Sequence, residues 1–263
     1  MRTFYEFFAG GGMARVGLGA GWRCAFANDF DAKKGAVYLA NFGAAGHLIV
    51  ADVADLTTAD LPGRPDLVWA SPPCQDISLA GKGAGLDGSR SSAFHPWWSL
   101  MRDLIADGRA PPIIVVENVA ALITSSNGAD FTAVARALAE AGYVFGALII
   151  GAALFVPQSR ERVFIVAVRA EASLPAGLAQ DGPTAPFHSA ALRNKAVANL
   201  PPSLRAYWRW WRLPTPPARN TTLLDLLDLE APCDGDAETR RLIELMEPSH
   251  RAKIERARES GER

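Results

Sequence analysis

The sequence predicts an α/β fold built on a largely parallel β-sheet, followed by a short and less regular C-terminal segment. Short apolar runs lie at residues 4–8, 22–27, 48–50, 67–70, 113–116, 147–150 and 163–168. Stretches with helical spacing lie among them, at residues 31–39, 93–105 and 130–141. Such alternation is typical of βαβ units, whose helices cover the faces of the sheet. We expect Asp130 to cap the third helix and Gly142 to end it.

Prolines become frequent among short helical pieces after residue 168. This change predicts a domain over residues 1–170 and a second region over residues 171–263. The segment Tyr207-Trp-Arg-Trp-Trp-Arg212 interleaves aromatic and basic side chains, which suits stacking on nucleic-acid bases. The alternative, which we favour, is that these aromatics pack against the main domain.

Composition and charge set limits on partners and location. The 27 Lys and Arg residues nearly balance the 28 Asp and Glu residues, so any nucleic-acid surface must be local. The three cysteines are odd in number and widely spaced, which argues against a disulfide framework and a close-spaced zinc site. The N-terminal apolar stretch is too short to span a membrane. We therefore expect a cytoplasmic protein with no metal and no membrane association.

Two strand ends suggest a site for an adenosine-bearing ligand. The first strand ends in Phe8-Ala9-Gly10-Gly11-Gly12, where glycines let backbone amides approach a ligand. The second ends in Asn28-Asp29, and the Asp29 carboxylate can accept hydrogen bonds from ribose hydroxyls. The alternative, to which we give equal weight, is that the glycines serve only the geometry of the turn and that Asp29 is a solvated acid. Asp52 follows the third strand at the same sheet edge, although such an acid is more often a turn residue or helix cap.

The most informative stretch is an apolar strand that runs into Ser71-Pro72-Pro73-Cys74-Gln75. Two prolines fix the backbone, so the thiol of Cys74 is held at a defined place at a strand end. A nucleophile has to be exposed and oriented in this way, which favours Cys74 as a catalytic thiol. Neither Cys24, in an apolar strand, nor Cys233, in an acidic loop, has such a setting.

Charged side chains follow two later apolar runs. Glu117 leaves residues 113–116, and low-dielectric surroundings there would favour its protonated form and suit it to donate a proton. Its alternative role is that of an acid at a helix N-terminus. Arg160 and Arg162 precede the run at 163–168 with the alternating spacing that puts both on one strand face. Paired guanidinium groups are suited to hold a phosphate or a base carbonyl.

Six short motifs in this order resemble those of the DNA cytosine-carbon-5 methyltransferases: Phe-Ala-Gly-Gly-Gly, Asn-Asp, Ala-Asp-Val, Ser-Pro-Pro-Cys-Gln, Glu-Asn-Val and Gln-Ser-Arg-Glu-Arg. The resemblance covers roughly residues 1 to 170. It implies a Rossmann-like methyltransferase fold that binds S-adenosylmethionine. It also implies an enzyme that acts on DNA as a monomer. The cofactor-binding residues that it implies are Phe8, Ala9, Gly10, Gly12, Asp29, Phe30, Asp52, Val53 and Pro72.

The resemblance also implies the catalytic roles. Cys74 would attack carbon 6 of a cytosine that has been flipped out of the duplex, and Glu117 would contact its ring nitrogen and exocyclic amine. Arg160 and Arg162 would hold the flipped nucleotide. Residues 85–94 resemble the loop that closes over the base in this family.

The C-terminal part departs from the family pattern. A target-recognition region and two late motifs normally follow the Gln-x-Arg-x-Arg strand, but this sequence contains no Gly-Asn dipeptide of the last motif. We therefore expect a second chain or a further C-terminal segment to complete the fold. Three alternatives stay open: methylation of tRNA, a catalytically silent fragment that binds DNA or cofactor, and a nicotinamide-dependent oxidoreductase. The last gives no account of the proline-cysteine, Glu-Asn-Val and Gln-x-Arg-x-Arg motifs.

Overall fold

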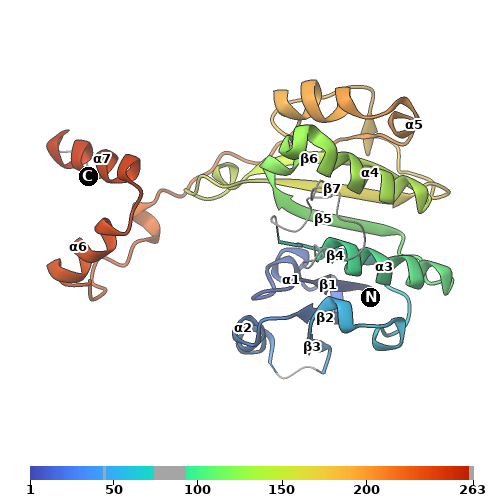
Figure 1. The fold of residues 1–263 in the computed structure, drawn as a ribbon, viewed down its shortest axis with the longest axis horizontal. Helices are drawn as coiled ribbons and strands as arrows, with labels where there is room; N and C mark the ends of the chain where they lie inside the picture. The colour runs from blue at the N-terminus through green and yellow to red at the C-terminus, as the bar shows by residue number, and fades with distance from the viewer. Residues whose placement is uncertain (44–45, 74–92, 261–263) are drawn as a thin grey trace. The chain divides into compact units, whose positions relative to one another are not determined.

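A computed structural model describes residues 1–43, 46–73 and 93–260. Its main feature is a seven-stranded sheet in the order β3-β2-β1-β4-β5-β7-β6, in which β7 is antiparallel to both neighbours and the other strands are parallel (Figure 1). The strands are β1 (Arg2–Phe7), β2 (Trp22–Asp29), β3 (Leu48–Val50), β4 (Leu67–Ala70), β5 (Ile113–Val119), β6 (Tyr143–Gly151) and β7 (Glu161–Arg169). The predicted α/β fold with a largely parallel sheet is confirmed.

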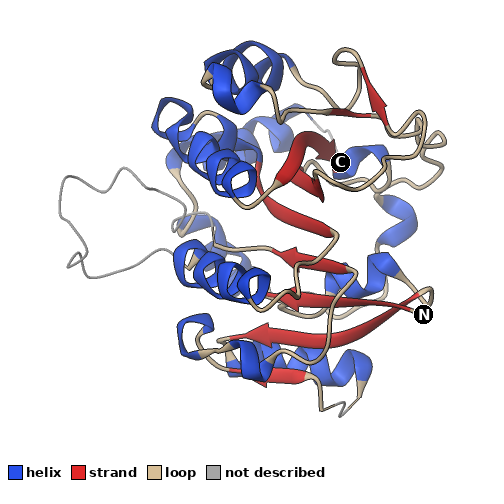
Figure 2. Ribbon diagram, turned by 90° about the vertical axis from the view of Figure 1, so that its right-hand side faces the viewer, coloured by secondary structure: helices blue, strands red, loops and turns tan. Residues whose placement is uncertain are grey.

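Helices cover both faces of this sheet (Figure 2). On one face, α1 (Met13–Leu18) and α2 (Ala32–Phe42) pack over Phe4 and its neighbours. On the other, α3 (Phe94–Ala106) and α4 (Ala129–Glu140) pack over Tyr5 and Phe7 in the larger core. Side chains on successive strand residues point to opposite faces, so the run Phe4 to Phe7 contributes to both cores.

The prediction that Asp130 caps the helix α4 is wrong. Its N-cap is Gly128, with φ +85°, and Asp130 lies inside the first turn with 4% exposure. Ser126 and Asn127 also have positive φ angles, of 48° and 57°, so backbone geometry rather than an acidic cap begins this helix. The Asp130 carboxylate accepts a hydrogen bond from Ser126 Oγ at 3.0 Å. At the other end Gly142 has φ +84°, as expected of a residue that ends a helix.

Residues 171–219 pack with the main sheet, and the first compact unit is Met1–Arg219. This segment contains α5 (Pro202–Arg205) and a two-stranded sheet of β8 (Ala179–Gln180) and β9 (Trp210–Trp211). Trp208 and Trp211 are buried, and the Trp211 indole donates to the Val166 carbonyl oxygen at 3.0 Å. Trp208 and Trp211 thus serve packing, as the favoured interpretation expected, whereas Tyr207 is 37% exposed.

The second compact unit is Asn220–Arg263, which contains α6 (Asp236–Glu244) and α7 (Pro248–Ser260). Neither helix buries a residue. The predicted functional division, with residues 1–170 as one domain and 171–263 as another region, stays a prediction.

Candidate active site

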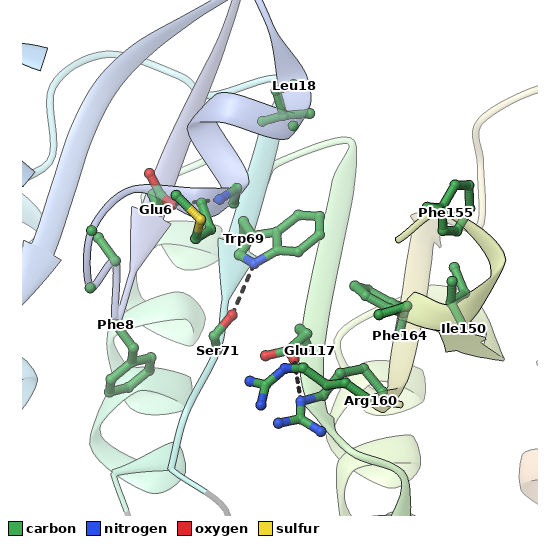
Figure 3. Close-up of a pocket in the computed structure, with 18 residues that line it drawn as sticks. Glu6, Phe8, Leu18, Trp69, Ser71, Glu117, Ile150, Phe155, Arg160 and Phe164 are labelled. Atoms are coloured by element: carbon green, nitrogen blue, oxygen red, sulfur yellow. Dashed lines mark hydrogen bonds and ion pairs between the residues drawn. The ribbon is translucent and has the colours of Figure 1, made fainter. Parts of the chain in front are cut away.

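A cavity of about 700 Å³ opens on the sheet face that carries α1, within the size range of small-molecule sites (Figure 3). It brings together residues from the end of β1 and α1, from β4 and β5, and from the β6–β7 connection. Six predicted site residues line it: Phe8, Ala9, Gly10, Glu117, Arg160 and Arg162. Residues that the sequence analysis did not single out also line it, among them Glu6, Trp69 and Phe164.

The glycine turn at the end of β1 is closely packed. A Cβ atom on Gly12 would lie 2.1 Å from Phe42 Cε2, and Gly12 has φ +84°, so only glycine fits this position without strain. Asp29 Oδ2 accepts a hydrogen bond from the Gly10 amide at 2.8 Å, and its Oδ1 accepts one from the Asp31 amide at 3.0 Å. The buried Asp29 carboxylate therefore fixes the turn from the neighbouring strand.

Glu6 is a buried acid beside this turn, with 1% of its surface exposed. Its Oε1 accepts hydrogen bonds from the backbone amides of Ala14 at 3.1 Å and Arg15 at 3.4 Å. Oε2 has no hydrogen-bond partner among the described residues. Burial raises the pKa of Glu6 to about 7, against the smaller opposite effects of the two amides and the Arg15 charge.

The other end of the cavity carries an ion pair. Arg162 Nε lies 3.2 Å from Glu117 Oε1, and the two side chains are 20% and 21% exposed. Pairing with the antiparallel β7 extends β5 to Val119, so Glu117 lies within the strand rather than after it. The expected low-dielectric setting of Glu117 is therefore wrong in detail, because the side chain keeps solvent contact and has a cationic neighbour. Arg160 precedes β7 and is exposed, and both arginines line the cavity.

The strand β4 leads from this cavity to the proline turn. Asn118, 3% exposed, donates from Nδ2 to the Pro72 carbonyl oxygen at 2.9 Å, and the Trp69 indole donates to Ser71 Oγ at 3.0 Å. Asn118 thereby fixes the start of the turn. Cys74, the predicted nucleophile, lies outside the described residues, as does most of the predicted closing loop at 85–94.

The remaining predicted cofactor residues are not among those that line the cavity. Phe30 follows β2 and is 64% exposed, with Lys34 Nζ 5.8 Å from its ring centroid. Asp52 follows β3 and accepts a hydrogen bond from the Ala54 amide at 2.9 Å, while Val53 is buried in the main core. The side chain of Asn28 donates to the carbonyl oxygens of Ile49 and Ala51, which ties the end of β3 to β2.

Within the described ranges, no group of three or more acidic, histidine or cysteine side chains could hold a metal ion. No helix in these ranges has the length and apolar character that crossing a membrane requires.

Known proteins with similar sequences include type II methyltransferases of bacteria. The chain is 31% identical to the type II methyltransferase M.HaeII of Haemophilus aegyptius over 163 residues, which covers 61% of this chain and 48% of the relative. It is 33% identical to M.HpaII of Haemophilus parainfluenzae over 169 residues, covering 62% and 45%. The chain thus spans about half the length of the curated relatives that it matches.

Solved structures with the same fold include the Dnmt2 methyltransferase of S. pombe, with a TM-score of 0.54 and 20% identity over 66% of this chain and 53% of that one. A putative DNA modification methyltransferase encoded within an E. coli prophage has a TM-score of 0.51 at 20% identity, over 64% of this chain and 47% of that one. The expected methyltransferase-like fold is confirmed. Residues 2–223 match the family described as C-5 cytosine-specific DNA methylase, and the chain belongs to this family.

Proposed function

We propose that this chain forms the cofactor-binding and catalytic part of an enzyme that methylates carbon 5 of cytosine in DNA. The observation that carries the proposal is the cavity, which unites the glycine turn with Glu117 and two arginines. At the same edge of the sheet, β4 is followed by the turn at Pro72, and Cys74 comes two residues later in the sequence. Residues 1–170 would supply this function, and residues 171–263 would begin the target-recognition region.

The residues present fit S-adenosylmethionine. The cavity has the volume of a cofactor site, Gly10 of the glycine turn lines it with open space where a Cβ atom would stand, and it contains one buried acid with an oxygen that has no partner among the described residues. Phe8, Ala9 and Gly10 would contact the cofactor from the cavity wall. The other proposed cofactor-binding residues are Gly12 in the same turn and, at the adjoining strand ends, Asp29, Phe30, Asp52, Val53 and Pro72. When bound, the cofactor supplies a methyl group on a positively charged sulfur.

The chain's own residues would then activate cytosine. Cys74 as a thiolate forms a bond to carbon 6, which makes carbon 5 electron-rich enough to take the methyl group. Glu117 holds a proton or hydrogen bond at ring nitrogen 3 and stabilises the charge that develops there. Loss of the carbon 5 proton and cleavage of the carbon–sulfur bond restore both aromaticity and Cys74. Arg160 and Arg162 would hold the flipped nucleotide and offset the cost of unstacking, roughly a few kcal/mol.

We further propose DNA as the macromolecular substrate, a monomer as the DNA-bound form, and the cytoplasm as the location. Relatives named type II methyltransferases support the choice of DNA and a role beside a restriction enzyme. A second chain or a further C-terminal segment would complete the enzyme, since the sequence contains no Gly-Asn dipeptide of the family's last motif.

The test is methyl transfer by the purified chain. The protein is incubated with S-adenosylmethionine and, separately, unmethylated DNA and tRNA, and the nucleosides are quantified by mass spectrometry. We expect 5-methylcytosine in DNA, lost by at least about a thousandfold in Cys74→Ser because the serine hydroxyl is a far weaker nucleophile. Cys233→Ser is the matched control, because this exposed thiol lies in the second compact unit.

The possible outcomes separate the alternatives. Product in tRNA alone would contradict the DNA assignment. Product in DNA that survives Cys74→Ser would contradict the mechanism. Absence of product with intact cofactor binding would contradict the activity of these residues alone. It would favour a completing segment, and addition of that segment should then restore methyl transfer.

A further inference from the structure

One stretch of the sequence is rich in cations and contains no acid. No Asp or Glu occurs between Asp181 and Asp225, but six basic residues do: Arg193, Lys195, Arg205, Arg209, Arg212 and Arg219. The rest of the chain has all 28 acidic residues against 21 of the 27 basic ones. The nearly neutral chain therefore contains a locally cationic segment, and such a segment attracts a polyanion.

The charges of this segment are not neutralised within the molecule. None of the six side chains forms an ion pair in the part of the chain that the structure describes. Three of them donate to backbone carbonyl oxygens instead: Arg205 to Ala198 and Leu200, Arg209 to Ala206 and Trp208, and Arg219 to Ala153 and Val156. A neutral carbonyl group holds a guanidinium in place but leaves its charge available to an external anion.

Two of the cations lie on η7 (Leu192–Val197), a π-helical segment. Leu192 and Ala196 are buried in the larger core, while the three residues between them, Arg193-Asn194-Lys195, are exposed. The π-helical geometry is rare and is often found at functional sites. Burial of one face fixes the segment, and both cations are thereby presented to solvent.

The segment η7 lies near the sheet edge that carries the candidate active site. It packs against η4 (Ala120–Ile123), which directly follows the end of β5 with Glu117-Asn118-Val119. The chain that leads into η7 is joined to the carboxyl half of β6, because the Ile149 amide donates to the Phe187 carbonyl oxygen at 2.8 Å. The two cations of η7 are therefore close to the strand ends that contribute to the cavity.

Arg219 adds a cation at the β6–β7 connection. Its Nη1 lies 3.4 Å from the Ala153 carbonyl oxygen and 3.2 Å from that of Val156. These carbonyl groups flank Phe155, which lines the cavity on the side away from Glu6 (Figure 3).

Position distinguishes these three cations from others in the segment. The Arg209 amide donates to the Phe145 carbonyl oxygen at 2.7 Å, near the start of β6 and so toward the opposite edge of the sheet. We call Arg193, Lys195 and Arg219 the basic rim.

We propose that the basic rim binds phosphates of the DNA backbone that flank the target cytosine. Phosphate contacts fix the position of a duplex but carry no sequence information. The rim would therefore hold the DNA over the cavity and leave the choice of sequence to other residues. This inference rests on the proposed function, since it takes DNA as the substrate.

The experiment measures binding of the complete chain to a fluorescently labelled, unmethylated duplex by anisotropy over a series of salt concentrations. Each phosphate contact contributes about 0.9 to the slope of log affinity against log salt. The double variant Arg193→Gln/Lys195→Gln should therefore reduce this slope by about 1.8 and lower affinity at about 50 mM salt roughly 10- to 100-fold. Arg219→Gln should reduce the slope by about 0.9. The losses should be the same for duplexes of unrelated sequence.

The double variant Arg23→Gln/Arg102→Gln is the matched control, because it removes the same charge away from the rim. Both arginines are exposed; Arg23 lies at the start of β2, and Arg102 lies in the second half of α3, which leads to the start of β5. This control should keep the slope of the unaltered chain. The exchange Arg193→Lys/Lys195→Arg preserves both charges and should keep the slope and affinity within about twofold. Thermal denaturation followed by circular dichroism shows that each variant keeps its fold.

Several results would overturn the inference. Equal losses in the two double glutamine variants would mean that net charge alone acts, and a loss of affinity with an unchanged slope would mean that the rim only supports the fold. Tighter binding of tRNA than of duplex DNA, weakened by the same variants, would assign the rim to RNA. An unaltered chain that does not bind the duplex would also contradict it. Failure of the proposed function has a different pattern, namely rim-dependent DNA binding without methyl transfer that depends on Cys74.

Discussion

Two glutamates line the same cavity from the same face of the sheet, yet their surroundings differ. Glu6, on β1, is 1% exposed and lacks an ion-pair partner among the described residues. Glu117, on β5, has a side chain that is 21% exposed and lies 3.2 Å from Arg162. Burial without a partner penalises a charged carboxyl, whereas a nearby guanidinium stabilises it.

This difference fits two tasks in the proposed active site. The buried Glu6 carboxyl accepts hydrogen bonds from the amides of Ala14 and Arg15 and so supports the start of α1. Glu117 is paired and partly solvated, and it is held in one orientation at the proposed reactive edge, which suits contact with a cytosine ring. Replacement by glutamine should therefore change stability at Glu6 and the rate of methylation at Glu117.

The largest effect is expected for Glu117→Gln. The amide cannot hold a proton at ring nitrogen 3, so we expect kcat to fall about 100- to 10,000-fold, the range for loss of a general acid. Affinity for S-adenosylmethionine should change less than about twofold, because Glu117 is proposed to contact the cytosine and not the cofactor. Single-turnover methylation of DNA and calorimetric titration measure the two quantities. A loss of cofactor affinity with an unchanged rate would contradict this assignment.

Much of the fold followed from the sequence because central parallel strands are buried on both faces. Their apolar runs were therefore visible, and the predicted strand at residues 67–70 agrees with β4 to the residue. The strand β5 was predicted too short, because Glu117 and Asn118 near its end are polar and gain their strand geometry from pairing with β7. The cap of α4 was missed because Asp130 was taken as the start of the helix, although Asn127-Gly128, both with positive φ, is itself a turn signal just before it.

The site was predictable where a charged residue borders an apolar run of the sequence, and obscure where it lies inside such a run. Arg160 and Arg162 were placed on one face by alternation, and both line the cavity. Glu6 was missed, although a single acid within Phe4-Tyr5-Glu6-Phe7-Phe8 is itself a signal, since a charge in a doubly buried strand needs a reason. Asn118 was overlooked because its partner, the Pro72 carbonyl, comes from a distant strand.

A smaller effect, on stability, is expected from the close packing of the glycine turn at the Glu6 end of the cavity. Gly12→Ala puts a Cβ within 2.1 Å of Phe42 Cε2 and forces alanine to φ +84°. We expect the free energy of unfolding to fall by about 3 to 4 kcal/mol, from left-handed strain plus overpacking. Gly10→Ala is the matched control, because its φ is +55° but its Cβ would meet open space, so about 1 kcal/mol is expected. Thermal denaturation followed by circular dichroism measures both, and equal losses would mean that Phe42 moves aside.

The pH dependence of stability should reveal the unpaired state of Glu6 without any ligand. Its pKa is about 7 in the folded chain against 4.5 for an ordinary glutamate, so the folded state keeps a proton that the unfolded state has already lost. The resulting stabilisation is complete below about pH 4.5 and disappears as the pH rises through 7. Glu6→Gln has no such proton to lose and resembles the protonated acid at every pH. Relative to the unaltered chain, we expect this variant to be more stable at pH 8 by about 2 to 3 kcal/mol and nearly equal at pH 4.5.

The same substitution would then raise stability at pH 8, because it replaces a buried carboxyl that is charged and unpaired there by a neutral amide. Thermal denaturation of both proteins between pH 4.5 and 8 measures this effect. Parallel pH profiles for the two proteins would show that Glu6 has a cationic partner in the free chain. In that case the contrast with Glu117 would be lost, because both acids would be paired before any ligand enters.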